Sequence, residues 1–196
     1  MANLISVAEY KEIEGIQSAK EDVRLATLVP SVSQLVKTYC GNSIIDYYST
    51  VKTEYFNINW ATPVVQLTES PVNSIVVVAE RATYSSEYVG LSEENKEYYF
   101  DSSTDSIIRT NSSGSKRNWP TGPGSVQILY TAGYESCPDD LKLAVVDLIT
   151  YYLKDEHKER RTIAGSSIQN ASSSSQRDNV AFPDHIKRVL DLYKNF

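Results

Sequence analysis

The chain of 196 residues has few of the side chains on which catalysis usually depends. It contains only two histidines and two cysteines. A nucleophile-and-base site needs a histidine or an equivalent base beside a serine or cysteine. His157 and His185, however, lie near helix ends among charged neighbours, as solvated surface histidines do. Cys40 and Cys137 lack the Cys-x-x-Cys spacing of zinc or redox sites. We therefore predict no enzymatic activity, no metal site and no bound cofactor.

Long apolar runs and an excess of positive charge are also missing. No stretch reaches the roughly 18 apolar residues that span a membrane, and no charged segment followed by an apolar one opens the chain. The formal net charge is −6, which leaves no global basic surface for nonspecific binding of nucleic acid. We expect a protein that is made and kept in a cytoplasm, without membrane contact.

Two helices are predicted near the start of the chain. Ser6 and Glu9 form a capping box, which predicts a short helix over 7–14. Apolar residues at helical spacing then predict a long helix over 20–40. Pro30 lies inside this second helix and cannot donate a backbone hydrogen bond, so it should either kink the helix or split it into two pieces.

Two more helices are predicted towards the end. Pro138 suits the first turn of a helix, and Asp139 and Asp140 favour the positive end of its dipole. The stretch 162–179 is rich in serine and poor in large apolar residues, which predicts a mobile loop. A last helix is expected over 184–194.

The middle of the chain has the pattern of β-strands. Short runs rich in β-branched and aromatic residues alternate with turns that contain proline or glycine. These runs cover 53–58, 64–67, 74–79, 97–100, 106–110 and 126–131. Gly133 permits a sharp turn into the Pro138 helix. The predicted fold class is α+β. A helical core of about four helices (1–49 and 134–196) carries a large antiparallel β insertion (50–133) between the first long helix and the Pro138 helix.

Several short motifs follow one another along this framework. They are Leu4-Ile-Ser-Val-Ala-Glu-Tyr-Lys11, the helix over 22–41 with its Leu-Val-Pro-Ser-Val and Tyr-Cys-Gly, Ser70-Pro-Val-Asn-Ser-Ile75, Trp119-Pro120, Tyr130-Thr-Ala-Gly-Tyr134 and Pro138-Asp-Asp-Leu-Lys-Leu-Ala144. In this order and spacing, the chain resembles the head-to-tail connector (adaptor) proteins of tailed bacteriophages. The resemblance covers residues 4 to about 155.

The resemblance implies a structural virion protein rather than an enzyme. Its expected place is the neck of the virion, at the head–tail interface. There it would form a ring of about twelve copies that docks under the portal after DNA packaging and carries the next neck or tail component. Its expected partners are further copies of itself, the portal protein and a head-closure or tail protein. The genome would pass through the channel of the ring without specific binding.

In related connectors the C-terminal region docks on the portal, so the resemblance also implies portal contacts here. Only 154–196 is a net positive segment of this acidic chain, which suits contact with an acidic partner surface or head-to-tail self-association. The same composition also fits an ordinary solvated mixture of charges. The implied contacts are apolar or charged residues of this region, namely Arg160, Arg161, Phe182, Ile186, Lys187, Arg188, Val189, Leu190, Tyr193 and Phe196. In the alternative interpretation, Ile186, Val189, Leu190 and Tyr193 cover the core of the protein itself.

Two other functions stay open at this point. One is a carbohydrate- or ligand-binding β domain on a helical scaffold. It requires Tyr55, Trp60, Tyr98 and Trp119 to converge on one exposed concave patch. The other is a hydrolase whose site has no recognisable motif.

Overall fold

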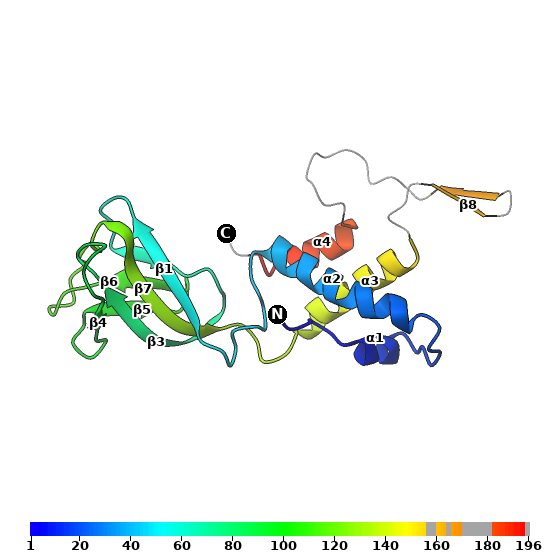
Figure 1. Cartoon of the computed structure of the whole chain (residues 1–196), viewed down its shortest axis with the longest axis horizontal. Coiled ribbons are helices and arrows are strands. Elements are labelled where there is room, and N and C mark those ends of the chain that lie inside the picture. The colour runs from blue at the N-terminus through cyan, green and yellow to red at the C-terminus, as the bar shows by residue number, and fades with distance from the viewer. Residues whose placement is uncertain (156–159, 164–165, 170–181, 195–196) are drawn as a thin grey trace. The chain divides into compact units, whose positions relative to one another are not determined.

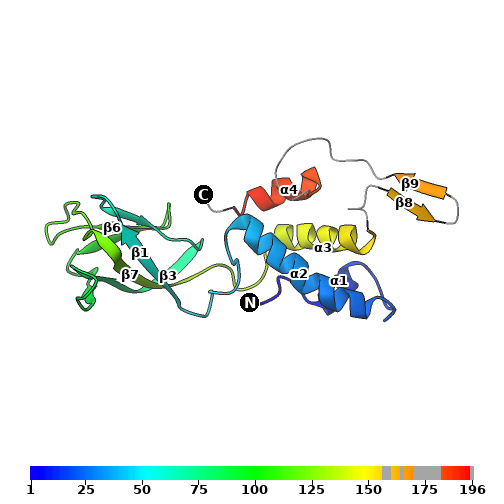
Figure 2. The same cartoon turned by 45° about the horizontal axis from the view of Figure 1, so that its top comes forward.

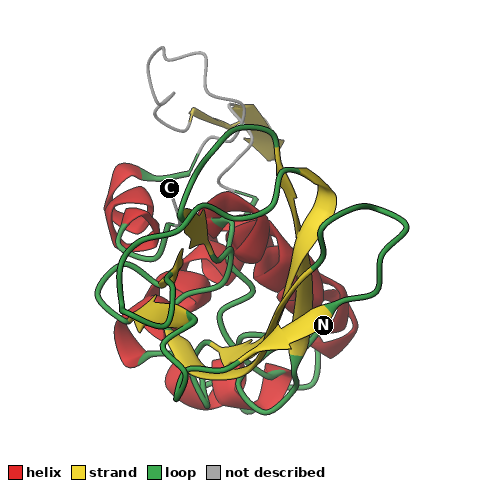
Figure 3. Cartoon of the chain, turned by 90° about the vertical axis from the view of Figure 1, so that its left-hand side faces the viewer, coloured by secondary structure: helices red, strands yellow, loops and turns green. Residues whose placement is uncertain are grey.

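The protein contains two compact units. The structure, a computed structural model, describes residues 1–155, 160–163, 166–169 and 182–194, with the backbone alone for 160–163 and 166–169. Residues 1–42 and 136–194 form the helical unit, and residues 43–135 form the β unit (Figure 1). The described residues hold four helices, with antiparallel sheets inserted between the second and the third. Figure 3 shows the helices in red and the strands in yellow. The predicted α+β fold class is confirmed.

Helix α1 (Val7–Ile13) begins at the predicted capping box. The Glu9 backbone N–H donates to Ser6 Oγ at 3.1 Å, and the Ser6 backbone N–H donates to Glu9 Oε2 at 2.7 Å. These two bonds satisfy backbone donors that the first turn of a helix would otherwise leave unpaired.

Helix α2 (Asp22–Cys40) passes through Pro30 as one helix and ends at Gly41, whose left-handed backbone closes the last turn. Of the two outcomes predicted for Pro30, splitting is therefore excluded. Pro30 lies on the exposed side of the helix, where the lost backbone bond faces water.

Helices α3 (Asp139–Leu153) and α4 (Asp184–Asp191) complete the helical unit, and both pack against α2 (Figure 2). Apolar residues at three- and four-residue steps are buried in these helices. The buried apolar side chains of α2 and α3 are Leu25, Val29, Val32, Val36, Cys40, Leu141, Ala144, Val145, Val146, Leu148 and Ile149.

Two antiparallel sheets build the β unit. One has the strand order β1-β7-β3-β4 and the other the order β2-β6-β5. The strands are β1 (Lys52–Ile58), β2 (Val64–Gln66), β3 (Val72–Glu80), β4 (Val89–Leu91), β5 (Tyr98–Asp101), β6 (Ser106–Arg109) and β7 (Gly122–Ala132). All of these strands except β4 were predicted.

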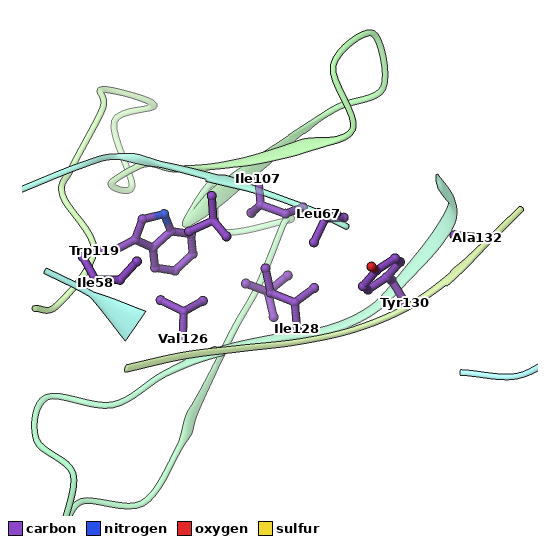
Figure 4. Packing of buried hydrophobic residues seen from close by; sticks show 10 residues of the cluster. Ile58, Leu67, Ile107, Trp119, Val126, Ile128, Tyr130 and Ala132 are labelled. Atoms are coloured by element: carbon purple, nitrogen blue, oxygen red, sulfur yellow. The ribbon is translucent and has the colours of Figure 1, made fainter. Parts of the chain in front are cut away.

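The core of the β unit lies between its two sheets. Val126, Ile128 and Tyr130 alternate along β7 and face Ile107 of β6 and Leu67, the residue after β2 (Figure 4). This is the period-two pattern that predicted the strand. The two sheets are thus two layers around one hydrophobic cluster.

One buried ion pair joins the two sheets of the β unit. Arg109 of β6 donates through Nε and one terminal nitrogen to the Glu80 carboxylate of β3, at 2.9 and 2.8 Å. The Arg109 side chain is only 3% exposed, and its guanidinium lies 5.9 Å from the ring centre of Trp119. Because a bidentate pair fixes both position and orientation, it sets how the two sheets align.

The predicted turn at Gly133 closes the β unit. Its φ of +93° suits glycine, and a Cβ there would lie 2.2 Å from the Ile44 carbonyl oxygen. Gly133 N–H donates to the Pro71 carbonyl at 2.7 Å, and Tyr134 N–H donates to the Ile44 carbonyl at 2.8 Å. The segment by which the chain enters the unit is therefore hydrogen-bonded to the segment by which it leaves. We call this contact the Ile44–Gly133 clamp.

The stretch after α3 differs from the loop predicted over 162–179. Strands β8 (Arg160–Ile163) and β9 (Ser166–Gln169) pair as an antiparallel hairpin. The Ser-rich sequence does not predict this hairpin, because the pairing of two backbones needs no apolar side chains. The other residues of the predicted loop lie outside the described ones.

Candidate functional site

Seven of the ten portal contacts implied for the C-terminal region lie on or next to α4 (Asp184–Asp191), and three of these seven are buried. Phe182, Ile186 and Leu190 are at most 4% exposed. The Phe182 ring meets the Tyr39 ring edge-on at 5.0 Å, and the Cys40 thiol donates to the Leu190 carbonyl at 3.6 Å. These side chains hold α4 against its own unit.

The opposite side of α4 is available to a partner. Arg188 is exposed, Lys187 and Val189 are half-buried, and Leu192 just after the helix is 77% exposed. α4 is thus amphipathic, with an anchored apolar side and an exposed side that carries Lys187 and Arg188 together with Asp184 and Asp191.

Tyr193, another implied contact, ties the chain after α4 to the start of α3. Its hydroxyl donates to Asp140 Oδ1 at 2.5 Å. This bond is the main reason why the pKa of the Asp140 carboxyl lies below its ordinary value. Asp140 therefore has a structural role beyond its place at the helix dipole.

The remaining implied residues cannot be placed as side chains. Arg160 and Arg161 lie in β8, of which the structure describes the backbone. Phe196 and His157 lie outside the described residues. His185, by contrast, has a 70% exposed side chain, as expected for a surface histidine.

The aromatic residues of the β unit do not form one concave patch. Trp119 is buried in the core at 2% exposure, and Tyr98 is partly buried against the same core. Tyr55 and Trp60 are exposed, at 58% and 71%. Since Trp119 is closed off from solvent, the arrangement required for the alternative carbohydrate-binding function is not present.

Neither cysteine is placed for chemistry. Both are buried, and burial raises the pKa of each thiol to about 12. Across the described parts of the chain, no three His, Cys, Asp or Glu side chains gather where they could hold a metal ion. No helix in those parts is long and apolar enough to cross a membrane.

The sequence matches the family model described as head completion protein over residues 3–196. The chain therefore belongs to the head completion protein family, a family of structural proteins. The family assignment is less specific than the predicted identity as an adaptor protein. It agrees with the expected location at the neck of a virion.

Relatives and solved structures are consistent with this family. The chain is 29% identical to the head completion protein of Escherichia phage T5 over 72 residues, which are 36% of this chain and 39% of that protein. Its fold is similar to a chain in the neck of an empty gene transfer agent (GTA) particle with C6 symmetry. That match has a TM-score of 0.60 and 16% identity, and covers 98% of this chain and 90% of the other. A chain in the neck of the native GTA particle with C12 symmetry gives 0.59 and 15%, with coverages of 97% and 88%.

Some contacts in the β unit were not predicted from the sequence. Arg81 is the clearest, because it donates to the carbonyls of Gly124, Tyr84 and Pro123 and lies 4.7 Å from the ring centres of Tyr84 and Tyr88. Its only sequence signal is an arginine among tyrosines, which does not indicate the contact with 123–124, about 40 residues further along.

Proposed function

We propose that this head completion protein is the adaptor of a phage-like neck. In this role it docks as a ring under the portal after DNA packaging and provides the platform for the next neck or tail component. The main support is the family match over residues 3–196. The similar fold of chains from GTA necks adds support for the neck.

A ring of about twelve copies around a DNA channel is part of this proposal. Ring closure needs identical copies that meet through two different surfaces. The net charge of −6 favours a passive channel, because acidic walls repel phosphates and let the duplex slide.

For the portal contact we propose the C-terminal region, with its side chains in two roles. Arg188, Lys187 and Val189 would touch the portal directly from the accessible side of α4. Phe182, Ile186 and Leu190 would act indirectly, by anchoring that helix. Arg160, Arg161, Tyr193 and Phe196 complete the proposed surface, and loops of the β unit would face the next neck component.

Electron microscopy of the purified protein mixed with its portal protein tests the proposal. We expect rings bound to the portal. The absence of both rings and portal binding would refute the adaptor function.

A charge reversal tests the portal surface separately. Arg188→Glu should weaken portal binding by about tenfold or more, because each of the many copies loses one favourable rim charge. Lys20→Glu is the matched control, since it makes the same change of charge at an exposed residue outside α4. Equal binding by the two variants would place the portal contact elsewhere.

A further inference from the structure

The hairpin formed by β8 and β9 is a sheet of only two strands. Their backbones pair from Arg160 opposite Gln169 to Ile163 opposite Ser166 (Figure 2). Among the strands that the structure describes, no third strand pairs with either of them. Within the described chain, both edges of this hairpin are therefore open.

A two-stranded hairpin by itself is only marginally stable in water. This hairpin also has little apolar surface to bury, because Ile163 and Ile168 are the only large apolar residues in its two strands. What it offers a partner is the row of backbone N–H and C=O groups along each edge. It is thus suited to gain further strands through backbone hydrogen bonds.

The direction of the two strands allows copies of the hairpin to pair with one another. β8 and β9 run antiparallel. When two hairpins lie side by side in the same orientation, β9 of one copy therefore meets β8 of the next as another antiparallel pair. This contact joins two different edges, so it repeats from copy to copy around a ring.

Other partners satisfy the hairpin less completely. Pairing with an edge strand of the β unit, such as β5, covers one edge of the hairpin and leaves the other open. A two-fold contact through β9 has the same defect. Closure of a sheet on itself, by contrast, removes every open edge.

The distribution of charge also favours contact between unlike strands. β8 carries Arg160 and Arg161, whereas β9 carries no charged residue. A two-fold contact between two β8 strands would bring the arginines of both copies onto one ladder, where like charges destabilise the pairing. In the β9–β8 contact, each strand with arginines lies between two uncharged strands.

We propose that the β8–β9 hairpins of neighbouring copies pair edge to edge and form a closed antiparallel β-barrel. The partner of each hairpin is thus a second copy of this chain. This inference rests on the ring of the proposed function and names one contact that closes it. The contact uses backbone groups, so it is compatible with the portal contacts proposed for Arg160 and Arg161.

The size of this barrel suits a channel. Two strands from each of about twelve copies, about 4.8 Å apart, give a circumference of about 115 Å and a diameter of about 37 Å before strand tilt widens it. Barrels of roughly 16–18 strands already enclose an aqueous channel. The barrel would therefore surround the axis of the ring and leave room for the DNA.

Disulfide formation in assembled particles tests the contact. Thr162 of β8 and Ser167 of β9 occupy the same face of the hairpin, because they are opposite each other in its register. Particles are assembled from equal amounts of Thr162→Cys and Ser167→Cys chains and treated with a mild oxidant. We expect disulfide-linked dimers between the two kinds of copy, since Cα atoms on adjacent strands lie about 5 Å apart, within reach of a disulfide.

Two further choices make this test specific. Gln169→Cys, two residues along β9 and on the same face, replaces Ser167→Cys in a second set of particles and detects a shifted register. The native cysteines are buried, with thiol pKa values of about 12, so they should not react.

Matched controls separate the contact from chance collisions. Particles that contain only one variant should give no dimers, because equal positions in neighbouring hairpins are two strands, or about 10 Å, apart. In the purified chain before assembly, the double variant Thr162→Cys/Ser167→Cys should close within its own hairpin and stay monomeric.

Hydrogen exchange of the natural chain gives a second measurement that needs no variant. The backbone amides of 160–163 and 166–169 should exchange at least about tenfold more slowly in particles than in the free chain, because pairing along both edges holds the strands together.

Four results would overturn the inference. They are mixed particles without disulfides for either position in β9, dimers from one variant alone, a disulfide to a different protein such as the portal, and unchanged exchange of the hairpin amides. Failure of the proposed function would look different, because the natural chain would then form no portal-bound rings.

Discussion

Replacing Gly133 by alanine should destabilise the β unit more than any other glycine-to-alanine change in it. Two effects combine at this position. The backbone has a φ of +93°, which L side chains rarely adopt, and the new Cβ would lie 2.2 Å from the Ile44 carbonyl oxygen. That oxygen also accepts the hydrogen bond from Tyr134 N–H, so any shift that relieves the clash strains this bond.

The size of the effect follows from these two parts. A left-handed conformation costs an L residue about 1–2 kcal/mol. A forced backbone shift in a packed site adds about 1–3 kcal/mol. We therefore expect Gly133→Ala to lower the free energy of unfolding by about 2–5 kcal/mol.

Urea unfolding followed by tryptophan fluorescence measures the unfolding free energy of the β unit, because the only two tryptophans, Trp60 and Trp119, both lie in that unit. Two glycines serve as controls. Gly114 has a φ of +78° with open space around it, so Gly114→Ala should lose only about 1 kcal/mol. Gly90 has neither constraint, and Gly90→Ala should stay within about 0.5 kcal/mol of the natural protein. A loss for Gly133→Ala no larger than that for Gly114→Ala would refute the clamp argument.

Three further predictions concern buried or hydrogen-bonded groups. Arg109→Ala should lower the unfolding free energy of the β unit by about 3–5 kcal/mol, because Glu80 is left without its partner, while Arg109→Met with Glu80→Leu should restore most of the loss. Failure of the double change to restore stability would contradict this role. Hydrogen bonds from Ser6 hold the pKa of Glu9 below its ordinary value of 4.5, so the folded helical unit binds fewer protons than the unfolded chain. The stabilisation is present at neutral pH and lost as the pH falls below 4.5. Ser6→Ala should thus lower the unfolding free energy, followed by far-UV circular dichroism, by about 1 kcal/mol at neutral pH and by less in acid; an equal loss at both would contradict it. Finally, because burial raises both cysteine pKa values to about 12, a maleimide should label the thiols only after unfolding. Rapid labelling of the folded protein would disprove this.

The parts of the fold that were predicted depend on local signals. The Ser6–Glu9 capping box, the glycine after α2 and the Pro138 start of α3 each act within a few residues, and each is where the sequence placed it. The outcome at Pro30 could not be chosen in the same way, because it depends on what surrounds the helix.

The features that were missed depend on contacts between distant residues. The three-residue strand β4 (Val89–Leu91) is recognisable only through its pairing with β3. The Arg109–Glu80 pair joins residues 29 positions apart. No local pattern distinguishes either from ordinary loop or surface sequence.

The candidate site shows the same limit. Helical spacing correctly indicated that α4 has an apolar side, but spacing does not tell whether that side covers the protein's own unit or a partner. The burial of Ile186 and Leu190 favours the former for these two residues. The division into a discontinuous helical domain and an inserted β domain stays a prediction about independent folding, which the unfolding experiment above can test.

The Ile44–Gly133 clamp has a consequence for how such a chain can change in evolution. Because the segment that enters the β unit is hydrogen-bonded to the segment that leaves it, the whole unit is an insertion between two adjacent points of backbone. An insertion of this kind can be lengthened, shortened or exchanged without moving the ends that the helices depend on. A chain built in this way can exchange the whole β unit as one module while its helices keep their sequence.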